Sequence, residues 1–130
     1  MKNVMIFVLL LIVPFVFNAQ PSKPEPTEIG PKMLFDVLTI DYGVIQKGAD
    51  PLRKFSFKNT GNEPLLITSA KGSCGCTVPT YPQEAIAPGA TAEIEVRYDT
   101  KRIGLINKTV TITSNAGDPV TLHIKGEVKE

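Results

Sequence analysis

Two cysteines one residue apart are the residues of this chain whose types and spacing could do chemistry. Cys74 and Cys76 flank Gly75 in the segment Gly72-Ser73-Cys74-Gly75-Cys76-Thr77, and the 130 residues contain no other cysteine. Two sulfurs at this spacing can form a disulfide, bind a thiophilic metal ion together, or pack as small apolar side chains. The sequence leaves these three interpretations open.

The disulfide interpretation depends on the distance between alternate residues of an extended chain. Residues i and i+2 of a strand point to the same side, with Cα atoms roughly 6.5 Å apart, near the upper end of what a disulfide spans. Gly75 would let the backbone bend and close that gap. A bond across one residue closes almost no loop, so it is more typical of a labile redox pair than of a structural cross-link. We therefore consider a Cys74–Cys76 disulfide as one candidate.

The same geometry suits a soft metal ion. Two thiolates on one side of the chain can bind Cu(I), which accepts few sulfur ligands, whereas zinc would need four ligands. The only histidine, His123, alternates with Thr121 and Lys125 on the expected solvent face of the last strand. Cys74 and Cys76 are therefore the candidate metal ligands, and Cu(I) is the candidate cofactor of a two-coordinate or partner-completed site.

The residue set does not indicate an enzyme. A cysteine nucleophile needs an activating base beside the thiol, and the lone His123 is assigned to a solvent face. A thioredoxin-type enzyme would place Cys-x-x-Cys at the start of a helix, and both the spacing and the helix are missing from this sequence. The sequence also contains no Ser/His/Asp set, phosphate-binding glycine loop or calcium loop. We therefore expect a noncatalytic domain.

The chain begins with the pattern of a secretory signal. Lys2 precedes an apolar run from Val4 to Phe17, and Ala19 supplies a small residue near the expected cleavage point. The run is shorter than the ~20 residues that a helical membrane span requires. We predict a signal peptide over residues 1–19 and an exported, periplasmic or cell-surface domain, with membrane contact only if the segment is not cleaved. Export would place the two cysteines where disulfides persist.

A proline-rich segment over residues 20–33 separates the signal from the remaining chain. Its prolines alternate with polar residues, a composition that favours an extended linker over a buried face. Without Lys2 the formal charge falls from +1 to about zero, and no basic cluster follows. We therefore expect no nucleic-acid partner, because such a partner requires a basic surface.

Beyond Leu34 the apolar residues alternate with a period of two, which is typical of strands with one buried face. The expected strands cover residues 37–42, 54–58, 65–70, 91–98, 108–114 and 120–128, with the cysteine segment among them. Glycine, proline and asparagine separate them as turns. About seven short strands of this kind predict an antiparallel sandwich over residues 34–130. On its surface, Glu93 and Glu95 are expected to pair with Lys108 or Arg97.

Five short segments carry a resemblance to a known family. They are Asp41-Tyr42-Gly43-Val44-Ile45, Phe57-Lys58-Asn59-Thr60-Gly61-Asn62-Glu63-Pro64-Leu65, Ser73-Cys74-Gly75-Cys76-Thr77, Ile86-Ala87-Pro88-Gly89 and Ile112-Thr113-Ser114-Asn115. Between about Leu38 and Val128 the chain resembles a bacterial family of exported domains of unknown function with a Ser-Cys-Gly-Cys-Thr motif. That family is similar to ASH/Hydin and major-sperm-protein-like domains. The resemblance implies a seven-stranded immunoglobulin-like β-sandwich in the cell envelope and no established activity.

Two functions follow as hypotheses from different classes. The first is a noncatalytic immunoglobulin-like interaction module of the bacterial cell envelope, which would bind a protein partner by an exposed edge strand or sheet face. The alternative is a thiol-based redox or Cu(I)-binding domain that uses Cys74 and Cys76. If neither chemistry operates, we expect the two cysteines to pack at the edge of the core beside Val78 and Tyr81.

Overall fold

The computed structural model describes residues 14–15 and 29–130, and within the latter range the chain folds into eight strands. The strands are β1 (Met33–Phe35), β2 (Thr39–Gln46), β3 (Leu52–Asn59), β4 (Ile67–Gly72), β5 (Thr77–Thr80), β6 (Thr91–Tyr98), β7 (Gly104–Ser114) and β8 (Val120–Lys129). The predicted signal peptide, apart from residues 14–15, and most of the predicted linker lie outside the described residues. Among the residues described, no helix has the length and apolar character needed to cross a membrane.

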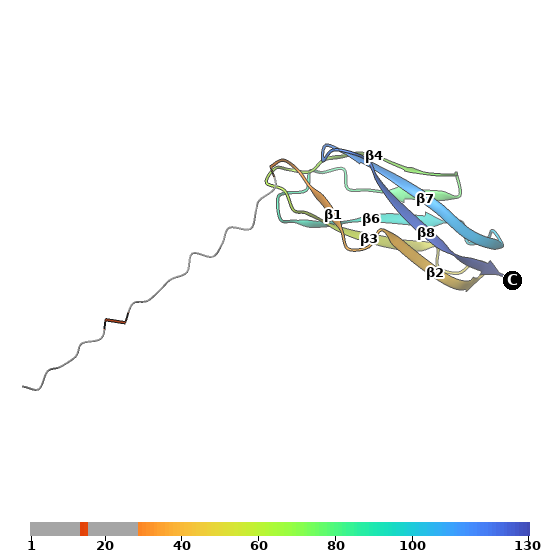
Figure 1. Cartoon of the computed structure of the whole chain (residues 1–130). Coiled ribbons are helices and arrows are strands. Elements are labelled where there is room, and N and C mark those ends of the chain that lie inside the picture. Colours follow the sequence, from red (N-terminus) through yellow and green to blue (C-terminus); the bar gives the residue numbers. More distant parts are fainter. Residues whose placement is uncertain (1–13, 16–28) are drawn as a thin grey trace, which may run out of the picture.

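Two four-stranded sheets pack face to face (Figure 1). One sheet has the order β1-β3-β6-β5, and the other has the order β2-β8-β7-β4. Neighbouring strands are antiparallel except β2 and β8, which run parallel. The all-β sandwich is confirmed, but the predicted seven antiparallel strands become eight with one parallel pair. The three residues of β1 are too few to show an alternating pattern, and a strand's own sequence does not specify the direction of its neighbour.

Strand β2 also continues beyond Gly43, where the sequence had suggested an end. A bulge between Asp41 and Val44 lets the pairing with β8 resume as far as Gln46. Gly43 adopts a φ of 72°, and Gly126 of β8 faces it closely enough that a Cβ atom there would lie 2.8 Å from the Gly43 carbonyl oxygen. Glycine at both positions therefore permits the bulge.

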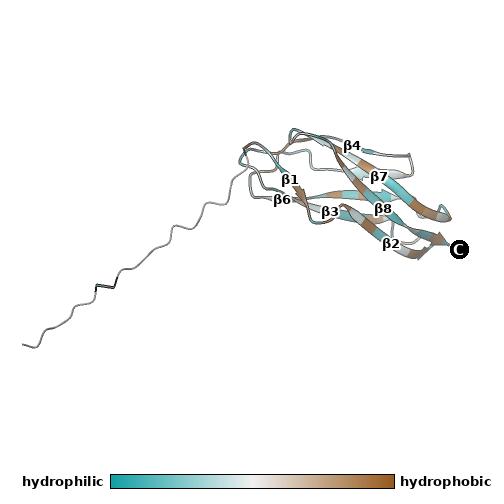
Figure 2. Cartoon of the chain, viewed as in Figure 1, coloured by the Kyte–Doolittle hydropathy of each residue, from teal (hydrophilic) through white to brown (hydrophobic). Residues whose placement is uncertain are grey.

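The core lies between the two sheets. It consists of the alternate residues of each strand whose side chains point inward. Hydrophobic and hydrophilic positions alternate along the ribbons in Figure 2, as a half-buried strand requires. The apolar side chains with 2% exposure or less are Phe55, Phe57, Leu65, Ile94, Val96, Ile106, Val110, Ile112, Leu122, Ile124 and Val128. The single buried face predicted from the period of two for residues 91–98, 108–114 and 120–128 is therefore confirmed.

Asn59, at the end of β3, is fully buried and replaces apolar packing with hydrogen bonds. Its Oδ1 accepts the backbone N–H groups of Lys32, at 3.2 Å, and Gly61, at 3.1 Å. Its Nδ2 donates to the carbonyl oxygens of Glu63, at 2.7 Å, and Ile86, at 2.9 Å. One side chain thus ties three separate segments together at this end of the sandwich.

The surface ion pairs differ from those predicted. The Nζ atom of Lys54 lies 3.6 Å from Glu93 Oε2 and 3.8 Å from Glu95 Oε1. The partner is therefore Lys54 rather than Lys108 or Arg97. The reason is strand order, since β3 is the neighbour of β6 while Lys108 belongs to β7 in the opposite sheet.

Candidate functional site

The two cysteines occupy the tight turn between β4 and β5. A disulfide joins Cys74 to Cys76, and their Cα atoms lie 5.3 Å apart. The Thr77 N–H donates to the Cys74 carbonyl oxygen at 3.2 Å, which closes the turn. A turn brings the cysteines closer than the roughly 6.5 Å of an extended strand, and the distance falls within the usual disulfide range.

Neighbouring strands hold this turn in place through backbone hydrogen bonds. The Ser73 N–H donates to the Thr109 carbonyl oxygen at 2.9 Å, and Ser73 Oγ accepts the Thr109 N–H at 3.2 Å. On the other side, the Asp99 N–H donates to the Cys76 carbonyl oxygen at 2.9 Å. These bonds tie the turn to β7 and to the loop after β6, independently of the disulfide.

The glycine that the turn requires is Gly72 rather than Gly75. A Cβ atom on Gly72 would overlap the Thr77 carbonyl group, whereas a Cβ atom on Gly75 would meet nothing within 4 Å. Gly75 also does not belong to the glycines with positive φ. The turn therefore has no steric or positive-φ requirement for glycine at position 75, in contrast to the expectation, whereas the close approach at position 72 does require glycine.

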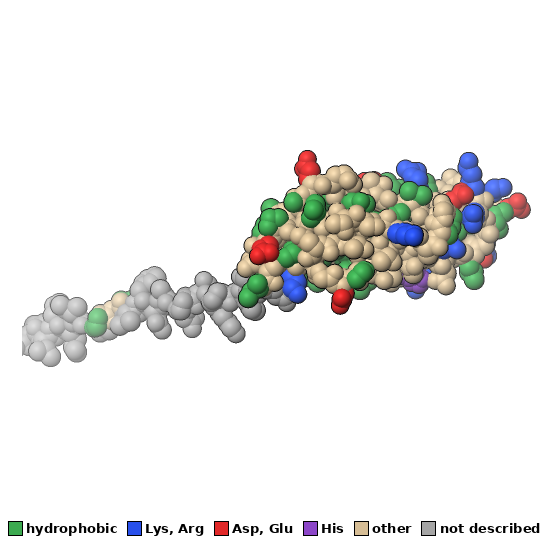
Figure 3. All heavy atoms as spheres, turned by 90° about the horizontal axis from the view of Figure 1, so that it is seen from above, with side chains coloured by type: hydrophobic (Ala, Val, Ile, Leu, Met, Phe, Trp, Pro, Cys, Tyr) green, Lys and Arg blue, Asp and Glu red, His purple; other side chains and the backbone are tan. Residues whose placement is uncertain are grey.

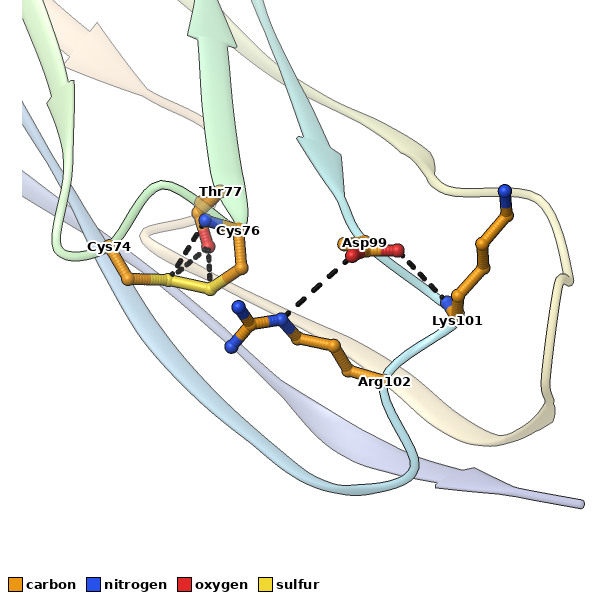
Figure 4. A network of polar contacts seen from close by, with 6 residues as sticks. All are labelled: Cys74, Cys76, Thr77, Asp99, Lys101 and Arg102. Carbon is orange, nitrogen blue, oxygen red and sulfur yellow. Dashed lines mark hydrogen bonds and ion pairs between the residues drawn. A yellow bond between two sulfur atoms is a disulfide. The ribbon is translucent and has the colours of Figure 1, made fainter.

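Three polar contacts surround the two sulfur atoms (Figure 4). The Cys76 N–H donates to Cys74 Sγ at 3.3 Å. The buried Thr77 hydroxyl lies 3.7 Å from both sulfur atoms. Cys76 is 6% exposed and belongs to the core, while Cys74 is half-buried at its edge. The two sulfurs therefore differ in their surroundings, although they belong to one short turn.

A groove of about 370 Å³ opens beside the disulfide. Cys76 and Gly75 line it from the turn, Pro51 lines it from the loop between β2 and β3, and Val78 and Arg97 line it from the sheet. The register of β5 and β6 sets these last two residues opposite each other, so their side chains share the outer face. Val78 is 54% exposed there.

The groove carries more positive than negative charge. Among its charged lining residues, Arg97 and Lys101 are cationic and Asp99 is anionic. The Asp99 carboxylate lies 3.8 Å from Arg102 Nε and accepts the Lys101 N–H at 3.1 Å. Figure 3 shows Lys and Arg side chains interspersed with Asp and Glu side chains at the right-hand end of the domain, where Figure 1 places the C-terminus beyond β8.

Tyr42 stabilises the wall of the groove opposite the cysteine turn. Its hydroxyl donates to the Pro51 carbonyl oxygen at 2.8 Å, and the Arg53 guanidinium lies 4.1 Å from the centroid of its ring. Burial raises the pKa of the Tyr42 phenol above its usual 10.0, and the Arg53 charge opposes part of that effect. Thr100 adds a hydrogen bond from Oγ1 to the Ala49 carbonyl oxygen at 2.7 Å. The loop between β2 and β3 is therefore held by side chains of β2 and of the segment after β6.

The structure brings Cys74 and Cys76 together and places the other sequence candidates elsewhere. His123 contacts Asn107 Oδ1 across β7 and β8 in the other sheet, as its solvent-face assignment suggested. No group of three or more His, Cys, Asp or Glu residues among the described positions could hold a metal ion. From the described residues, Cu(I) binding would use Cys74 and Cys76 in a two-coordinate or partner-completed site, and it would require the disulfide to be reduced first. Tyr81 packs against the core near the turn, while Val78 faces the groove.

The groove residues were not found from the sequence. Arg97 and Lys101 had no role beyond surface charge in the alternating pattern, and Pro51 belongs to a loop far from the cysteines along the chain. Knowledge that β5 pairs with β6 would have revealed part of the groove, because this pairing sets Val78 beside Arg97.

Three solved structures show the same fold at low sequence identity. A protein of unknown function from Porphyromonas gingivalis W83 is 15% identical with a TM-score of 0.66, covering 80% of this chain and 50% of that one. The ASH / PapD-like domain 7 of human CEP192 is 10% identical with a TM-score of 0.59, covering 87% and 96%. The Pseudomonas aeruginosa CupB2 chaperone is 12% identical with a TM-score of 0.54, covering 73% and 55%. The chain thus spans only about half of the two bacterial proteins.

These similarities establish an immunoglobulin-like, PapD-like sandwich and agree with the resemblance seen in the sequence. No curated protein matches the chain. The match that defines the family covers residues 33–128, from the start of β1 almost to the end of β8. The chain belongs to the family described as "Protein of unknown function (DUF1573)".

Proposed function

We propose that this chain is a noncatalytic interaction module of the bacterial cell envelope that is exported by residues 1–19 and binds a protein partner. The observation that carries the proposal is the groove beside β5, where an exposed apolar side chain, Val78, lies next to cationic Arg97. The likeness to a protein named as a chaperone supports binding to other proteins. The family contributes a fold without a named activity.

The groove favours binding by a sheet face over the addition of a strand. Strand β5 is the outermost strand of its sheet, but it has only four residues and contains Pro79, which has no N–H group to pair with an incoming strand. Side chains of the outer face, by contrast, are accessible, and a volume of about 370 Å³ is within the range of ligand-sized sites. A groove lined by apolar Pro51 and Val78 and by cationic Arg97 and Lys101 suits a partner segment that combines apolar and acidic side chains.

Site-specific photo-crosslinking in cells tests this proposal. A crosslinking residue at Val78 is expected to give one or a few discrete adducts, and Arg97→Glu is expected to weaken them. The matched control is Leu105, which is 78% exposed on β7 of the opposite sheet and should give none of these adducts. Equal labelling from both positions, or none from Val78, would contradict the proposal. Fractionation and the intact mass of the same protein test export and removal of residues 1–19.

A thiol-based role is the second candidate, because the disulfide forms part of the groove wall. Its Cu(I) branch requires both thiols to be reduced, and the turn would then present two sulfurs from one short segment. Near-stoichiometric retention of Cu(I) by the reduced protein, lost in a Cys74→Ser/Cys76→Ser variant, would support metal binding. Retention that persists in this variant would exclude these two residues as ligands.

A further inference from the structure

We propose that the Cys74–Cys76 disulfide undergoes exchange with an anionic thiol that enters the groove, with Cys76 as the attacked sulfur and Cys74 as the leaving thiolate. The inference goes beyond the interaction module, because it requires no partner protein. It is also compatible with a noncatalytic domain, since each molecule carries one disulfide and reacts once.

The groove is lined by one of the two cysteines and not by the other. Cys76 and Gly75 line it, and Cys74 does not. Figure 4 shows the Cys76 sulfur on the side of the Asp99–Arg102 loop, with the Cys74 sulfur beyond it. An attacking thiolate must approach the disulfide on the side opposite the sulfur that leaves. Cys74 is the more exposed residue as a whole, but a thiol held in the groove faces Cys76.

The hydrogen bonds of the turn favour the departure of Cys74. The Cys76 N–H donates to Cys74 Sγ at 3.3 Å, and a donor at that position stabilises the negative charge that develops on the leaving sulfur. The Thr77 hydroxyl, at 3.7 Å from both sulfurs, would assist either one and does not discriminate between them. The Cys76 N–H therefore distinguishes the two sulfurs, because it contacts Cys74 Sγ only. It favours Cys74 as the leaving sulfur, in agreement with the position of Cys76 in the groove.

Charge selects the incoming thiol. Arg97 and Lys101 line the groove, while the Asp99 carboxylate is engaged by Arg102. Such a site raises the local concentration of anionic molecules, and nearby cations favour the thiolate form that attacks a disulfide. A thiol with a net negative charge is therefore expected to react faster than a thiol with a net positive charge.

The reaction balances with two equivalents of the thiol. The first thiolate forms a bond to Cys76 Sγ as the Cys74–Cys76 bond breaks, and the electron pair leaves with Cys74. A second thiolate then attacks this mixed disulfide at the sulfur that came from the first thiol molecule, and Cys76 leaves as a thiolate. Two thiols are oxidised to one disulfide, the protein disulfide is reduced to two thiols, and the two protons pass to the cysteines.

Mass spectrometry of the full-length oxidised protein with glutathione tests the direction of attack. After acid quenching and alkylation of free thiols, fragmentation between Cys74 and Cys76 locates each modification. Glutathione on Cys76 and the alkyl group on Cys74 are the expected result. Glutathione on Cys74, or a disulfide that does not react, would overturn the inference. Because no partner is present, neither outcome depends on the interaction proposed above.

Charge reversal tests the groove. At low salt, Lys101→Glu is expected to slow the reaction with glutathione roughly three-fold or more and to accelerate the reaction with cysteamine, which is cationic. Lys125→Glu is the matched control, because it makes the same charge change on β8 of the other sheet. Equal effects of the two variants would overturn the assignment. An acidic cysteine peptide that reacts faster than glutathione would identify a protein segment as the natural thiol, and the reverse order would identify a small molecule.

Discussion

Asn59→Asp replaces one amide by a carboxylate of nearly the same shape, and it should destabilise the domain strongly. In the wild-type protein Nδ2 donates to the carbonyl oxygens of Glu63 and Ile86, while Oδ1 accepts two N–H groups. The variant keeps the acceptor and loses both donors, so a buried carboxylate oxygen faces two carbonyl oxygens. The loss of two hydrogen bonds, with their partners left unsatisfied, costs about 3–5 kcal/mol. That is a large share of the ~5–15 kcal/mol that stabilises a typical domain.

The same amide-to-carboxylate change at Asn62 is the matched control. The Asn62 side chain is exposed, and its Oδ1 accepts the Gly30 N–H at 2.8 Å, a role that a carboxylate can also fill. Asn62→Asp should therefore change the free energy of unfolding by less than about 0.5 kcal/mol. Equilibrium denaturation followed by circular dichroism measures both variants, because the chain contains no tryptophan to serve as a fluorescent probe.

The deficit of Asn59→Asp should also depend on pH with a definite sign. Burial raises the pKa of the introduced carboxyl in the folded state above its unfolded value. The neutral form carries no charge and donates one hydrogen bond, so the variant should recover stability relative to wild type as the pH falls below that raised pKa. A variant within 1 kcal/mol of wild type at pH 7, or one with a deficit that grows on acidification, would refute this account of Asn59.

Three further predictions concern the groove and its walls. Gly72→Ala should lower the melting temperature by several degrees because its Cβ would overlap the next strand, whereas Gly75→Ala should leave it nearly unchanged. The pKa of Tyr42 is raised by folding, so its contribution to stability is complete below the unfolded pKa of about 10 and is lost as the pH rises toward the folded value. Tyr42→Phe should therefore show a smaller alkaline loss of stability in denaturation series at pH 8–11, and an equal loss would contradict that role. The Cys74→Ser/Cys76→Ser variant should keep the native circular dichroism spectrum and lose less than about 2 kcal/mol, because the bond closes a loop of one residue; an unfolded variant would assign the pair a structural role.

Local alternation carries the information about which residues are buried, and it does not identify neighbouring strands. The inward positions Ile94, Val96 and Tyr98 follow from a period of two and are all buried. The partner of Glu93 could not be found in this way, because it depends on the strand that lies beside β6. The same limit applies to β2, whose parallel pairing with β8 is a property of the whole topology.

The candidate site shows the same division between local and distant information. The cysteine pair is visible in the sequence because two rare residues lie one position apart. The groove beside it is assembled from a loop before β3, the strand β5 and the loop after β6, and only the folded chain brings these together. The requirement for glycine at position 72 rather than 75 was equally hidden, because it arises from the Thr77 carbonyl group, which approaches Gly72 closely only in the folded chain.

The groove and the buried hydrogen bonds of Asn59 lie at opposite ends of β3, so residues important for the reaction are distant from residues important for folding. Pro51, just before β3, lines the groove, while Asn59, at its other end, holds three segments by hydrogen bonds. Eight residues of extended strand place these ends roughly 23 Å apart. The backbone hydrogen bonds that tie the cysteine turn to Thr109 and Asp99 do not involve the sulfur atoms. We therefore expect the domain to open its disulfide without losing its fold, which is the property that an exchange site needs and a structural cross-link does not.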